Sequence, residues 1–597
     1  MDYSDDKGLN FELVQAKLKN APSFKINGIT VHSAYNPVSE GKKWAESAME
    51  KITGKPESVI IFGLGFGYHI KALVELLRET YGVKITVVEP SAESFDYIKE
   101  NIEISDFLEK NGINVFVPDA ESLDAQKIIE KLEMKDRGAL FFELASYKNI
   151  FPKTYDLIYK SYNISQFFSP PAFKVLIVQP MYGGSSTIGN YIYRAFLNCG
   201  YNAKIIDFSR FYDGYRYLGD FTKNEDHVNS LRQLQINLMS EALLSSVLNE
   251  PPDMVLFMAQ APAAERVILK LKSMGIKTAY WFVEDFRTIT YWGSIARHVD
   301  YFFTIQKDAF FKELENLGIS NYRYLPMACL PDFHNKIAER NEYDEKRYAC
   351  DVSFAGAGYF NRKNVFAQLL DFNFKIWGND WAAEMPLKLF IQEGGRRFSE
   401  EEAVKIYNYS KININLHSSM WHWEINPNGD FLNPRVYEIL GCGGFQLIDR
   451  RSYLEGVFED GKDLVVFDSV SDLRKKIRYY LDHEDERNAI AEHGYATVRK
   501  LHTYEQRVSE MMSVILLDSY ESIKPKLILR RENMSRLLKE TESNPELHEL
   551  LLHFSDKESL SIGEMVDYIR RGKGRLSKTE AMILMLWAAK SKLIKLG

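Results

Sequence analysis

The sequence predicts a multidomain α/β protein, and three observations support this expectation. An apolar strand, a turn with glycine and an amphipathic helix follow one another at three places, which start near residues 58, 173 and 350, and this order is typical of parallel α/β units. A chain of 597 residues is too long for one hydrophobic core. From about residue 516 onward, helical patterns recur without strands. We therefore expect several parallel sheets followed by a helical tail.

Two sequence features mark the domain boundaries. The pair Pro170-Pro171 precedes the second strand start, and the polar stretch 337–347 precedes the third. We expect an accessory domain at 1–165, two further α/β domains at 166–338 and 339–515, and a helical tail at 516–597. The tail carries an apolar face of Met582, Leu586, Leu593 and Leu596. This face could pair with a second copy of the chain or pack on the chain's own core, and the sequence leaves both open.

Composition and charge exclude several classes of protein. The formal charge of −7 and a pI of about 6.0 argue against a nucleic-acid-binding chain. The four cysteines are far apart in sequence, so they predict neither a zinc site nor a disulfide framework, and a reducing cytoplasm is the expected location. The acidic start of the chain is unlike a secretory signal, and no apolar run reaches the roughly 20 residues of a membrane helix.

The first domain has a glycine-rich turn after its first strand. Gly63, Gly65 and Gly67 follow this strand, and Glu89 ends the next one. The pattern resembles the first two motifs of S-adenosylmethionine-dependent methyltransferases, which would make these four residues a cofactor site. However, the acidic residue that such enzymes carry two positions before the first glycine is Ile61 here. We interpret the domain as a degenerate Rossmann-like module that positions an acceptor protein or steadies the assembly, with a working methyltransferase as the alternative.

Five segments of the 166–515 region occur in the order found in a known family. They are the strand and glycine turn 351–362, the strand and Trp-Gly turn 375–381, the strand 412–417, the motif 433–445 and the start of a closing helix at 502–507. Together they resemble the CgeB-like spore-maturation glycosyltransferases and, more broadly, the group-1 glycosyltransferases of the GT-B fold. The resemblance implies a GT-B pair of Rossmann-like lobes, with the acceptor lobe at 166–338 and the nucleotide-sugar donor lobe at 339–515.

The resemblance also implies a donor site around Glu438. Asp430 lies eight positions before Glu438, which reads D-x7-E where many of these enzymes carry E-x7-E. The second acid of that motif holds the donor ribose, since an ionised carboxylate accepts hydrogen bonds from both ribose hydroxyls. Gly441, Gly443 and Gly444 would let the nucleotide approach the backbone. The alternative is an ordinary helix with one exposed Glu and a glycine turn.

The departing diphosphate needs positive charge, and this fold supplies it without a metal ion. The related families place basic residues after the first glycine turn of the donor lobe, where this sequence has Arg362 and Lys363 after Gly356 and Gly358. An ordinary basic helix start is the alternative. His417 ends a predicted strand and is expected to contact phosphate or sugar, with a structural histidine as the alternative.

The acceptor lobe offers two groups of candidates at the carboxyl edge of its sheet, where open parallel sheets bind ligands. Gly183, Gly184 and Ser185 form the loop after the first strand, and Asp285 follows a buried strand. If the enzyme inverts the anomeric centre, Asp285 is the expected general base for the acceptor hydroxyl. Alternatively, Asp285 caps the following turn or pairs with Arg287.

The expected function is therefore that of a cytoplasmic, hexosyltransferase-type glycosyltransferase. It would move a sugar from a nucleotide donor, with UDP implied by analogy, to a hydroxyl of a protein or glycan, such as flagellin or a spore-coat component. Two alternatives remain open at this point. One is a bifunctional enzyme with methyltransferase activity in the first domain, and the other is a non-catalytic nucleotide-binding scaffold.

Overall fold

The computed structural model describes residues 8–17, 21–52, 56, 58–77, 83–118, 128–129, 132, 139–168, 170–381, 386–555, 560, 562–572 and 574–593. The chain forms two compact units. The first unit comprises Met1–Ala172, Ser509–Leu560 and Lys573–Met585, and the second comprises Phe173–Val508, Ser561–Gly572 and Leu586–Gly597. Leu596, one of the four apolar tail residues singled out above, lies outside the described residues.

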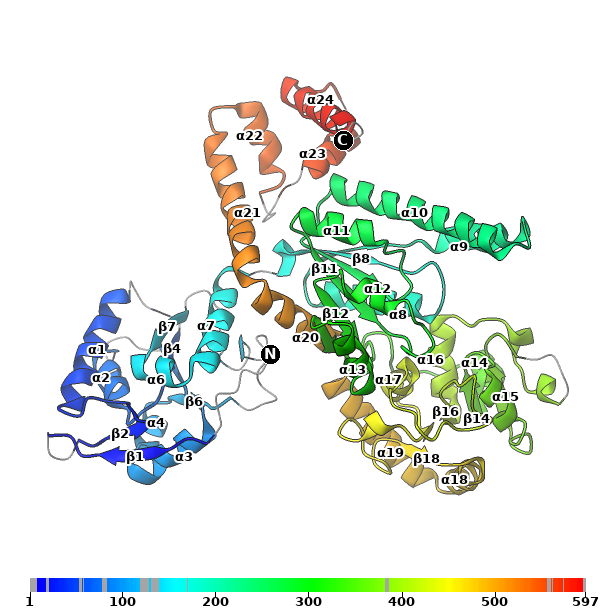
Figure 1. Ribbon diagram of the computed structural model, residues 1–597, viewed down its shortest axis with the longest axis horizontal. Helices are drawn as coiled ribbons and strands as arrows, with labels where there is room; N and C mark the ends of the chain where they lie inside the picture. Colours follow the sequence, from blue (N-terminus) through cyan, green and yellow to red (C-terminus); the bar gives the residue numbers. More distant parts are fainter. Residues whose placement is uncertain are drawn as a thin grey trace. The chain divides into compact units, whose positions relative to one another are not determined.

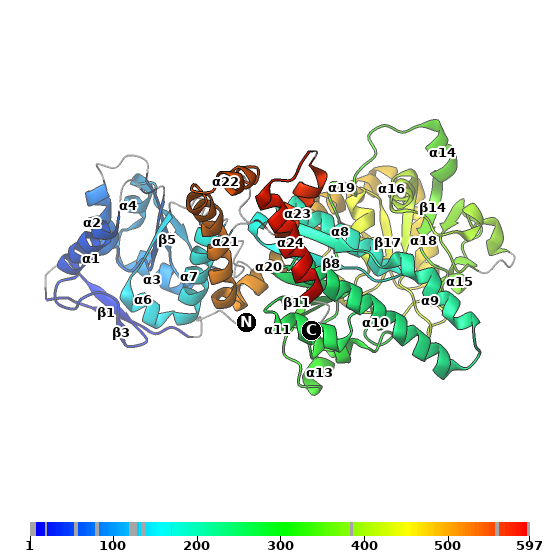
Figure 2. The same cartoon turned by 90° about the horizontal axis from the view of Figure 1, so that it is seen from above.

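The first unit contains a small antiparallel sheet and a parallel sheet. In the parallel sheet the strand order is β6-β5-β4-β7, which is Rossmann-like, as the glycine turn after residue 62 had predicted. Helices α1 and α2 pack against each other on one side of this sheet, and α7 lies on the other (Figures 1 and 2). The strands are β1 (Phe11–Val14), β2 (Ser23–Ile26), β3 (Ile29–Thr30), β4 (Ser58–Phe62), β5 (Lys84–Val88), β6 (Asn114–Phe116) and β7 (Ala139–Glu143), and the helices are α1 (Pro37–Lys51), α2 (Tyr68–Leu77), α3 (Ala92–Asn101), α4 (Ser105–Lys110), α6 (Ala145–Ile150) and α7 (Pro152–Phe167).

The tail is helical, as its sequence pattern predicted. Helix α21 packs against α7 within the first unit, and α22 packs against α21. The described tail helices are α20 (Tyr504–Asp518), α21 (Tyr520–Glu540), α22 (Pro545–Leu552), α23 (Ile562–Arg571) and α24 (Lys578–Leu593). Two of the apolar residues expected to form an interface, Met582 and Leu586, are exposed on α24.

The second unit begins with a six-stranded parallel sheet in the order β13-β12-β11-β10-β8-β9. Helices α8 and α10 lie on opposite sides of β8 (Figures 1 and 2). The strands are β8 (Lys174–Val178), β9 (Asn202–Ile206), β10 (Met254–Met258), β11 (Lys277–Phe282), β12 (Tyr301–Thr304) and β13 (Tyr322–Tyr324), and the helices are α8 (Gly184–Asn198), α9 (Tyr212–Tyr217), α10 (Glu225–Asn249), α11 (Glu265–Ser273), α12 (Trp292–Ala296) and α13 (Ala309–Asn316). This sheet forms the first lobe of the unit.

The second lobe is a five-stranded parallel sheet in the order β15-β14-β16-β17-β18. The strand order reverses between β14 and β16, and such a switch point is where open parallel sheets bind ligands. The strands are β14 (Cys350–Ala355), β15 (Phe374–Trp377), β16 (Ser410–Asn415), β17 (Gln446–Asp449) and β18 (Val465–Phe467), and the helices are α14 (Glu342–Tyr348), α15 (Phe360–Phe366), α16 (Glu400–Tyr409), α17 (Pro434–Gly441), α18 (Val470–Asp482) and α19 (Glu484–Leu501). The strands expected near residues 350, 375 and 412 are thus confirmed.

Two buried clusters cover the two faces of this second sheet. On one face, Val365 of α15, Leu473 of α18 and Ile490 of α19 pack against the strands. On the other face, Tyr348 of α14, Ile406 of α16 and Ile439 of α17 do so, the last of these next to Cys442. The sheet is therefore doubly wound, with α15 and α17 on opposite faces.

After the second sheet, the chain returns to the first lobe. Residues Cys329 and Thr503 form a parallel bridge, in which the Cys329 N–H donates to the His502 carbonyl at 2.9 Å and the Tyr504 N–H donates to the Cys329 carbonyl at 2.9 Å. At the start of α20, the buried Arg507 donates from Nε to the Pro326 carbonyl at 3.0 Å. Two Rossmann-like lobes joined in this way form the GT-B architecture that the sequence predicted.

Two features bear on the classes of protein considered above. Among the residues whose placement is described, no helix is both long enough and apolar enough to cross a bilayer. The four cysteines are all unpaired.

The contact between α17 and α19 yields a stability prediction. A Cβ atom at Gly494 of α19 would fall closer to the Asp463 carbonyl oxygen than real Cβ atoms approach, and 2.8 Å from Leu440 Cδ2. Because this crowding involves backbone, Gly494→Ala should destabilise the second unit by about 1–3 kcal/mol, and its unfolding midpoint in calorimetry should fall. The control is Gly214→Ala, where the nearest atom is Gln235 Nε2 at 3.7 Å. Equal midpoints for the two variants would contradict this packing.

Candidate active site

The carboxyl edges of the two sheets in the second unit face each other, as contacts between their loops show. Asp430, in the loop after β16, accepts a hydrogen bond from Arg287 Nη2 at 2.8 Å and one from Gln306 Nε2 at 3.1 Å. Arg397 Nη2 of the second lobe donates to the Gly183 carbonyl of the first at 3.1 Å. A ligand bound at either edge would therefore lie near residues of both lobes.

Glu438 lies on α17 and is half-buried. Its Oε2 accepts a hydrogen bond from the Tyr407 hydroxyl at 3.4 Å. Burial raises the pKa of Glu438 to about 7, although the positive charge of Arg435 opposes this rise. Its carboxylate would gain from further donors, which a ribose diol provides.

Arg435, which the sequence analysis did not identify, lies one turn before Glu438. Its Nη1 donates to Asn415 Oδ1 at 3.0 Å, and its guanidinium lies 5.0 Å from the centre of the Phe354 ring. A Cβ atom at Gly356 would come within 2.6 Å of Arg435 Nη2, so a larger residue there would displace the guanidinium. Arg435 is half-exposed, which leaves a cation at the switch point beside the start of α17. The signal in the sequence was the Pro-Arg pair that opens this helix.

Arg362 is buried and does not face the candidate donor site as expected. It is 4% exposed, and its guanidinium donates to the carbonyls of Leu416 at 2.9 Å and Ala357 at 2.9 Å. Burial and the charge of Arg435 lower its pKa. The expectation that Arg362 contacts a diphosphate is therefore corrected, because its donors tie the loop after β14 to the end of β16. Lys363 is half-exposed on the first turn of α15, and its role as a phosphate contact stays a prediction.

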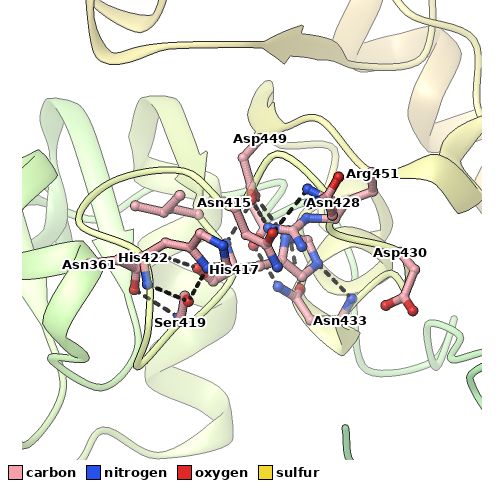
Figure 3. A network of polar contacts seen from close by, with 12 residues as sticks. Asn361, Asn415, His417, Ser419, His422, Asn428, Asp430, Asn433, Asp449 and Arg451 are labelled. Carbon is pink, nitrogen blue, oxygen red and sulfur yellow. Dashed lines mark hydrogen bonds and ion pairs between the residues drawn. The ribbon is translucent and has the colours of Figure 1, made fainter. Parts of the chain in front are cut away.

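His417 is at the centre of a buried polar network (Figure 3). Its Nε2 accepts the backbone N–H of Asn433 at 3.0 Å, so the ring proton is on Nδ1, which donates to Asp449 Oδ1 at 2.8 Å. Asp449 also pairs with Arg451. Burial and the charge of Arg451 lower the pKa of His417 to about 4, despite the nearby Asp449. Both ring nitrogens are satisfied, so His417 is structural rather than a contact to phosphate or sugar.

The same network fixes the start of α17. Asn433 precedes the helix and exchanges side-chain hydrogen bonds with Asn415 at the end of β16, at 3.0 and 3.2 Å. The Asn433 side chain does not cap α17. Pro434 has no N–H and the Val436 N–H donates to the Asn433 carbonyl at 3.2 Å, so the Arg435 N–H is the group of this first turn that could bind an anion. Because Asn415 also accepts a hydrogen bond from Arg435, this network holds Arg435 in place.

The remaining donor-lobe glycines divide into two groups. A Cβ atom at Gly358 would lie 2.6 Å from the Asp380 carbonyl oxygen, so this glycine allows two loops of the lobe to meet. The Gly443 and Gly444 N–H groups donate to the Leu440 and Ile439 carbonyls at 2.9 Å each and end α17.

A Cβ atom at Gly441 would lie 2.9 Å from Cys329 Cβ. The expectation that Gly441, Gly443 and Gly444 line the nucleotide pocket is corrected, because they close and pack the far end of the helix, which leads to the amino edge of β17.

In the acceptor lobe, the structure favours Glu284 over Asp285 as the candidate general base. Ser185 Oγ donates to Glu284 Oε1 at 2.7 Å, and burial raises the pKa of Glu284 despite this bond. Asp285 instead accepts the Arg287 N–H at 3.1 Å and lies 3.4 Å from the Arg287 guanidinium. This is the capping and pairing alternative stated above for Asp285. Gly183, at a φ of +98°, and the exposed Gly184 open α8 next to Ser185.

The glycine turn of the first unit does not fit a nucleotide cofactor. Gly63, Gly65 and Gly67 are buried, and a Cβ atom at Gly63 would lie 2.6 Å from Cγ of the Tyr147 ring. The Tyr147 hydroxyl accepts the Gly65 N–H at 3.2 Å, and His32 Nε2 accepts the Phe66 N–H at 2.9 Å. Protein side chains therefore occupy the space above the turn.

Glu89, the proposed ribose contact of that site, is 0% exposed. Its Oε2 accepts the Leu64 N–H at 3.1 Å. The expectation of an S-adenosylmethionine site at Gly63, Gly65, Gly67 and Glu89 is corrected, since the Rossmann-like sheet is present but its glycine turn holds the protein's own side chains. Within the described ranges, no group of three or more His, Cys, Asp or Glu side chains is placed to hold a metal ion.

The buried His417 predicts a pH dependence of stability. The unfolded chain takes up a proton on this residue near pH 6.5 but the folded chain only near pH 4, so stability falls as the pH drops from 6.5 towards 4, by up to roughly 3 kcal/mol. The unfolding midpoint of the second unit should be lower at pH 5 than at pH 7, and His417→Gln should reduce that difference. The exposed His483→Gln is the control. An undiminished difference in His417→Gln would contradict the prediction.

The sequence is similar to known glycosyltransferases. Residues 362–513 match the model of a family described as glycosyl transferase-like. Spore protein CgeB of Bacillus subtilis (strain 168) is 23% identical over 278 residues, which cover 44% of this chain and 83% of CgeB.

Solved structures are similar at a weaker level. Sucrose-phosphate synthase from Thermosynechococcus elongatus is 10% identical with a TM-score of 0.41, over 59% of this chain and 100% of that one. Anabaena HepE in complex with UDP and glucose is 10% identical with a TM-score of 0.39, over 57% of this chain and 99% of that one. The fold rests on the strand orders and the return crossover rather than on these likenesses. With the family match and the CgeB relative, these features show that the two-lobed part of the chain has the GT-B fold and is similar to CgeB-like glycosyltransferases.

Proposed function

We propose that this chain transfers a hexose from a nucleotide sugar to an acceptor hydroxyl. The observation that carries the proposal is the placement of Arg435 and Glu438 on the first turns of one helix, at the switch point of the second sheet. A cation there suits a diphosphate, and a carboxylate one turn later suits a ribose. UDP, the nucleotide that the family resemblance implies, is the first donor to test.

The diphosphate would be held by the guanidinium and the backbone N–H of Arg435 and by Lys363. These groups gain most when the glycosidic bond breaks, because the departing nucleoside diphosphate then carries additional negative charge. Asp430, now bound by Arg287 and Gln306, would meet the donor sugar, as the first acid of the D-x7-E pair.

Glu284 would act as the general base in an inverting reaction. The acceptor oxygen forms a bond to the anomeric carbon, the bond from that carbon to the phosphate oxygen breaks, and the hydroxyl proton passes to Glu284. A carboxylate whose pKa is raised is a better base near neutral pH than an ordinary one. The hydrogen bond from Ser185 holds the carboxylate in position.

The acceptor is proposed to be a bacterial surface protein, such as flagellin or a spore-coat component, or a glycan attached to it. The relative CgeB is named as a spore protein, which supports a surface acceptor. Transfer would take place in the cytoplasm, before the acceptor is assembled.

The donor site is tested by titrating the protein with UDP in a calorimeter. Glu438→Ala should weaken UDP binding by about 1.5–3 kcal/mol, because charge-assisted hydrogen bonds to the ribose are lost. The control is Glu339→Ala, an exposed glutamate of the same unit. If Glu438→Ala binds UDP as tightly as the control does, Glu438 is not part of the donor site.

The proposed base is tested by the rate of UDP release from UDP-glucose in the presence of flagellin or spore-coat protein. Glu284→Gln should lower kcat about 10²–10⁴-fold and leave the calorimetric affinity for UDP unchanged. Asp285→Asn serves as the matched neighbour and should have a smaller effect. A larger loss in Asp285→Asn than in Glu284→Gln would move the base to Asp285.

A further inference from the structure

Aromatic side chains are exposed on the second lobe, in the segments that follow β14 and β16. Trp421 and Trp423 are 89% and 64% exposed, and they lie in the loop after β16. The ring of Phe360, at the start of α15, meets the Trp423 ring edge to face at 5.4 Å, and Tyr359 is exposed beside it in sequence. We call Tyr359, Phe360, Trp421 and Trp423 the aromatic platform. Large apolar side chains exposed together at one place indicate a binding surface.

The loop that carries the tryptophans is held by buried polar contacts beneath it (Figure 3). Asn361, which is 0% exposed, accepts the Ser419 N–H at 2.9 Å and donates to the His417 carbonyl at 2.9 Å. Ser419 Oγ accepts the N–H groups of Trp421 at 3.3 Å and His422 at 3.2 Å. The exposed rings therefore sit on a turn with a defined conformation.

Hydrogen-bonding groups alternate with the rings of the platform. Because Ser419 Oγ accepts two N–H groups, its own proton is available to His422 Nδ1, 2.8 Å away. This contact leaves the proton of a neutral His422 on Nε2, as a donor. Glu424, which follows Trp423, accepts from Gln368 Nε2 at 3.0 Å and retains further acceptor capacity.

Rings beside such donors and acceptors match the chemistry of a sugar. A pyranose presents C–H groups on its faces and hydroxyls around its rim, so it stacks on an indole while its hydroxyls hydrogen-bond at the edges. The exposed indoles supply the flat apolar faces, and His422 and Glu424 supply the partners for hydroxyls. A purely apolar partner would leave these polar groups without hydrogen bonds at a cost in affinity.

The position of the platform indicates whether it binds the donor sugar or a sugar of the acceptor. The platform belongs to the loops after β14 and β16, the two strands that flank the switch point. Its Phe360 opens α15 on one face of the sheet, whereas Arg435 and Glu438 lie on α17 on the other face. In Figure 3, His422 and Ser419 lie at one end of the network and Asp430, which contacts the other lobe, lies at the opposite end. The platform and the donor site therefore lie on segments that flank the same switch point, on opposite faces of the sheet.

We propose that the aromatic platform binds a pyranose ring of the acceptor, which makes the acceptor a saccharide chain rather than a bare polypeptide. This inference rests on the proposed glycosyltransferase function and specifies its acceptor class. The transferred sugar would be added to a chain whose inner residue stacks on Trp421 and Trp423.

The test is a tryptophan-fluorescence and saturation-transfer NMR titration with three trisaccharides: cellotriose, maltotriose and the β1,4-linked trimer of N-acetylglucosamine. At least one should bind the wild-type protein, and Trp421→Ala and Trp423→Ala should each weaken its binding at least tenfold. Tyr343→Ala is the matched control, because Tyr343 is an aromatic residue of the same lobe that is 70% exposed. The calorimetric affinity for UDP should be unchanged in all three variants.

Four outcomes would overturn the inference. The first is that no trisaccharide binds the wild-type protein, and the second is that both tryptophan variants bind the trisaccharide as tightly as the wild type does. The third is that Tyr343→Ala weakens trisaccharide binding as much as the tryptophan variants do. The fourth is that the tryptophan variants bind UDP-glucose more weakly but bind UDP with unchanged affinity. The last would assign the platform to the donor sugar. If the wild-type protein binds UDP but none of the trisaccharides, only the assignment of the acceptor is wrong. If the wild-type protein does not bind UDP, the proposed function itself is wrong.

Discussion

The candidate site depends on one buried contact, the neutral His417 ring held between the Asp449 carboxylate and the Asn433 N–H. This ring joins the ends of β16 and β17 to the start of α17. Since His417 and Asp449 are buried, removing either side chain would leave a buried polar group unsatisfied, at a cost of about 1–3 kcal/mol. These bonds hold together the two ends of the loop between β16 and α17.

Two arginines of the second lobe lie at the same place but differ in burial and in hydrogen-bond partners. Arg362 and Arg435 both lie 5.0 Å from the Phe354 ring centre, at the same switch point. Arg362 is buried and donates to two backbone carbonyls, whereas Arg435 donates to one amide and stays half-exposed. Burial therefore assigns the positioning role to Arg362 and leaves the charge of Arg435 for a ligand.

The sequence predicted the strands and glycine turns because alternating or continuous apolar runs and glycines are local signals. It could not predict which way a side chain faces, so it favoured Arg362 over Arg435 and Asp285 over Glu284. Glu284 is the residue next to Asp285, whereas Arg435 lies on a different helix from Arg362 and comes near it only because both arginines lie beside the Phe354 ring. Contacts such as the bond from Ser185 to Glu284, 99 residues apart in sequence, decide between such neighbours, and a single sequence does not contain them.

Two glycine turns of this chain follow parallel strands and have opposite environments. After β4, side chains distant in sequence, Tyr147 and His32, fill the space over the buried glycines. After β14, Gly356 is half-exposed beside Arg435. Glycine in such a turn indicates only that another group, from a ligand or from the protein, approaches the backbone closely. Whether this is a ligand or the protein itself depends on residues that are distant in sequence.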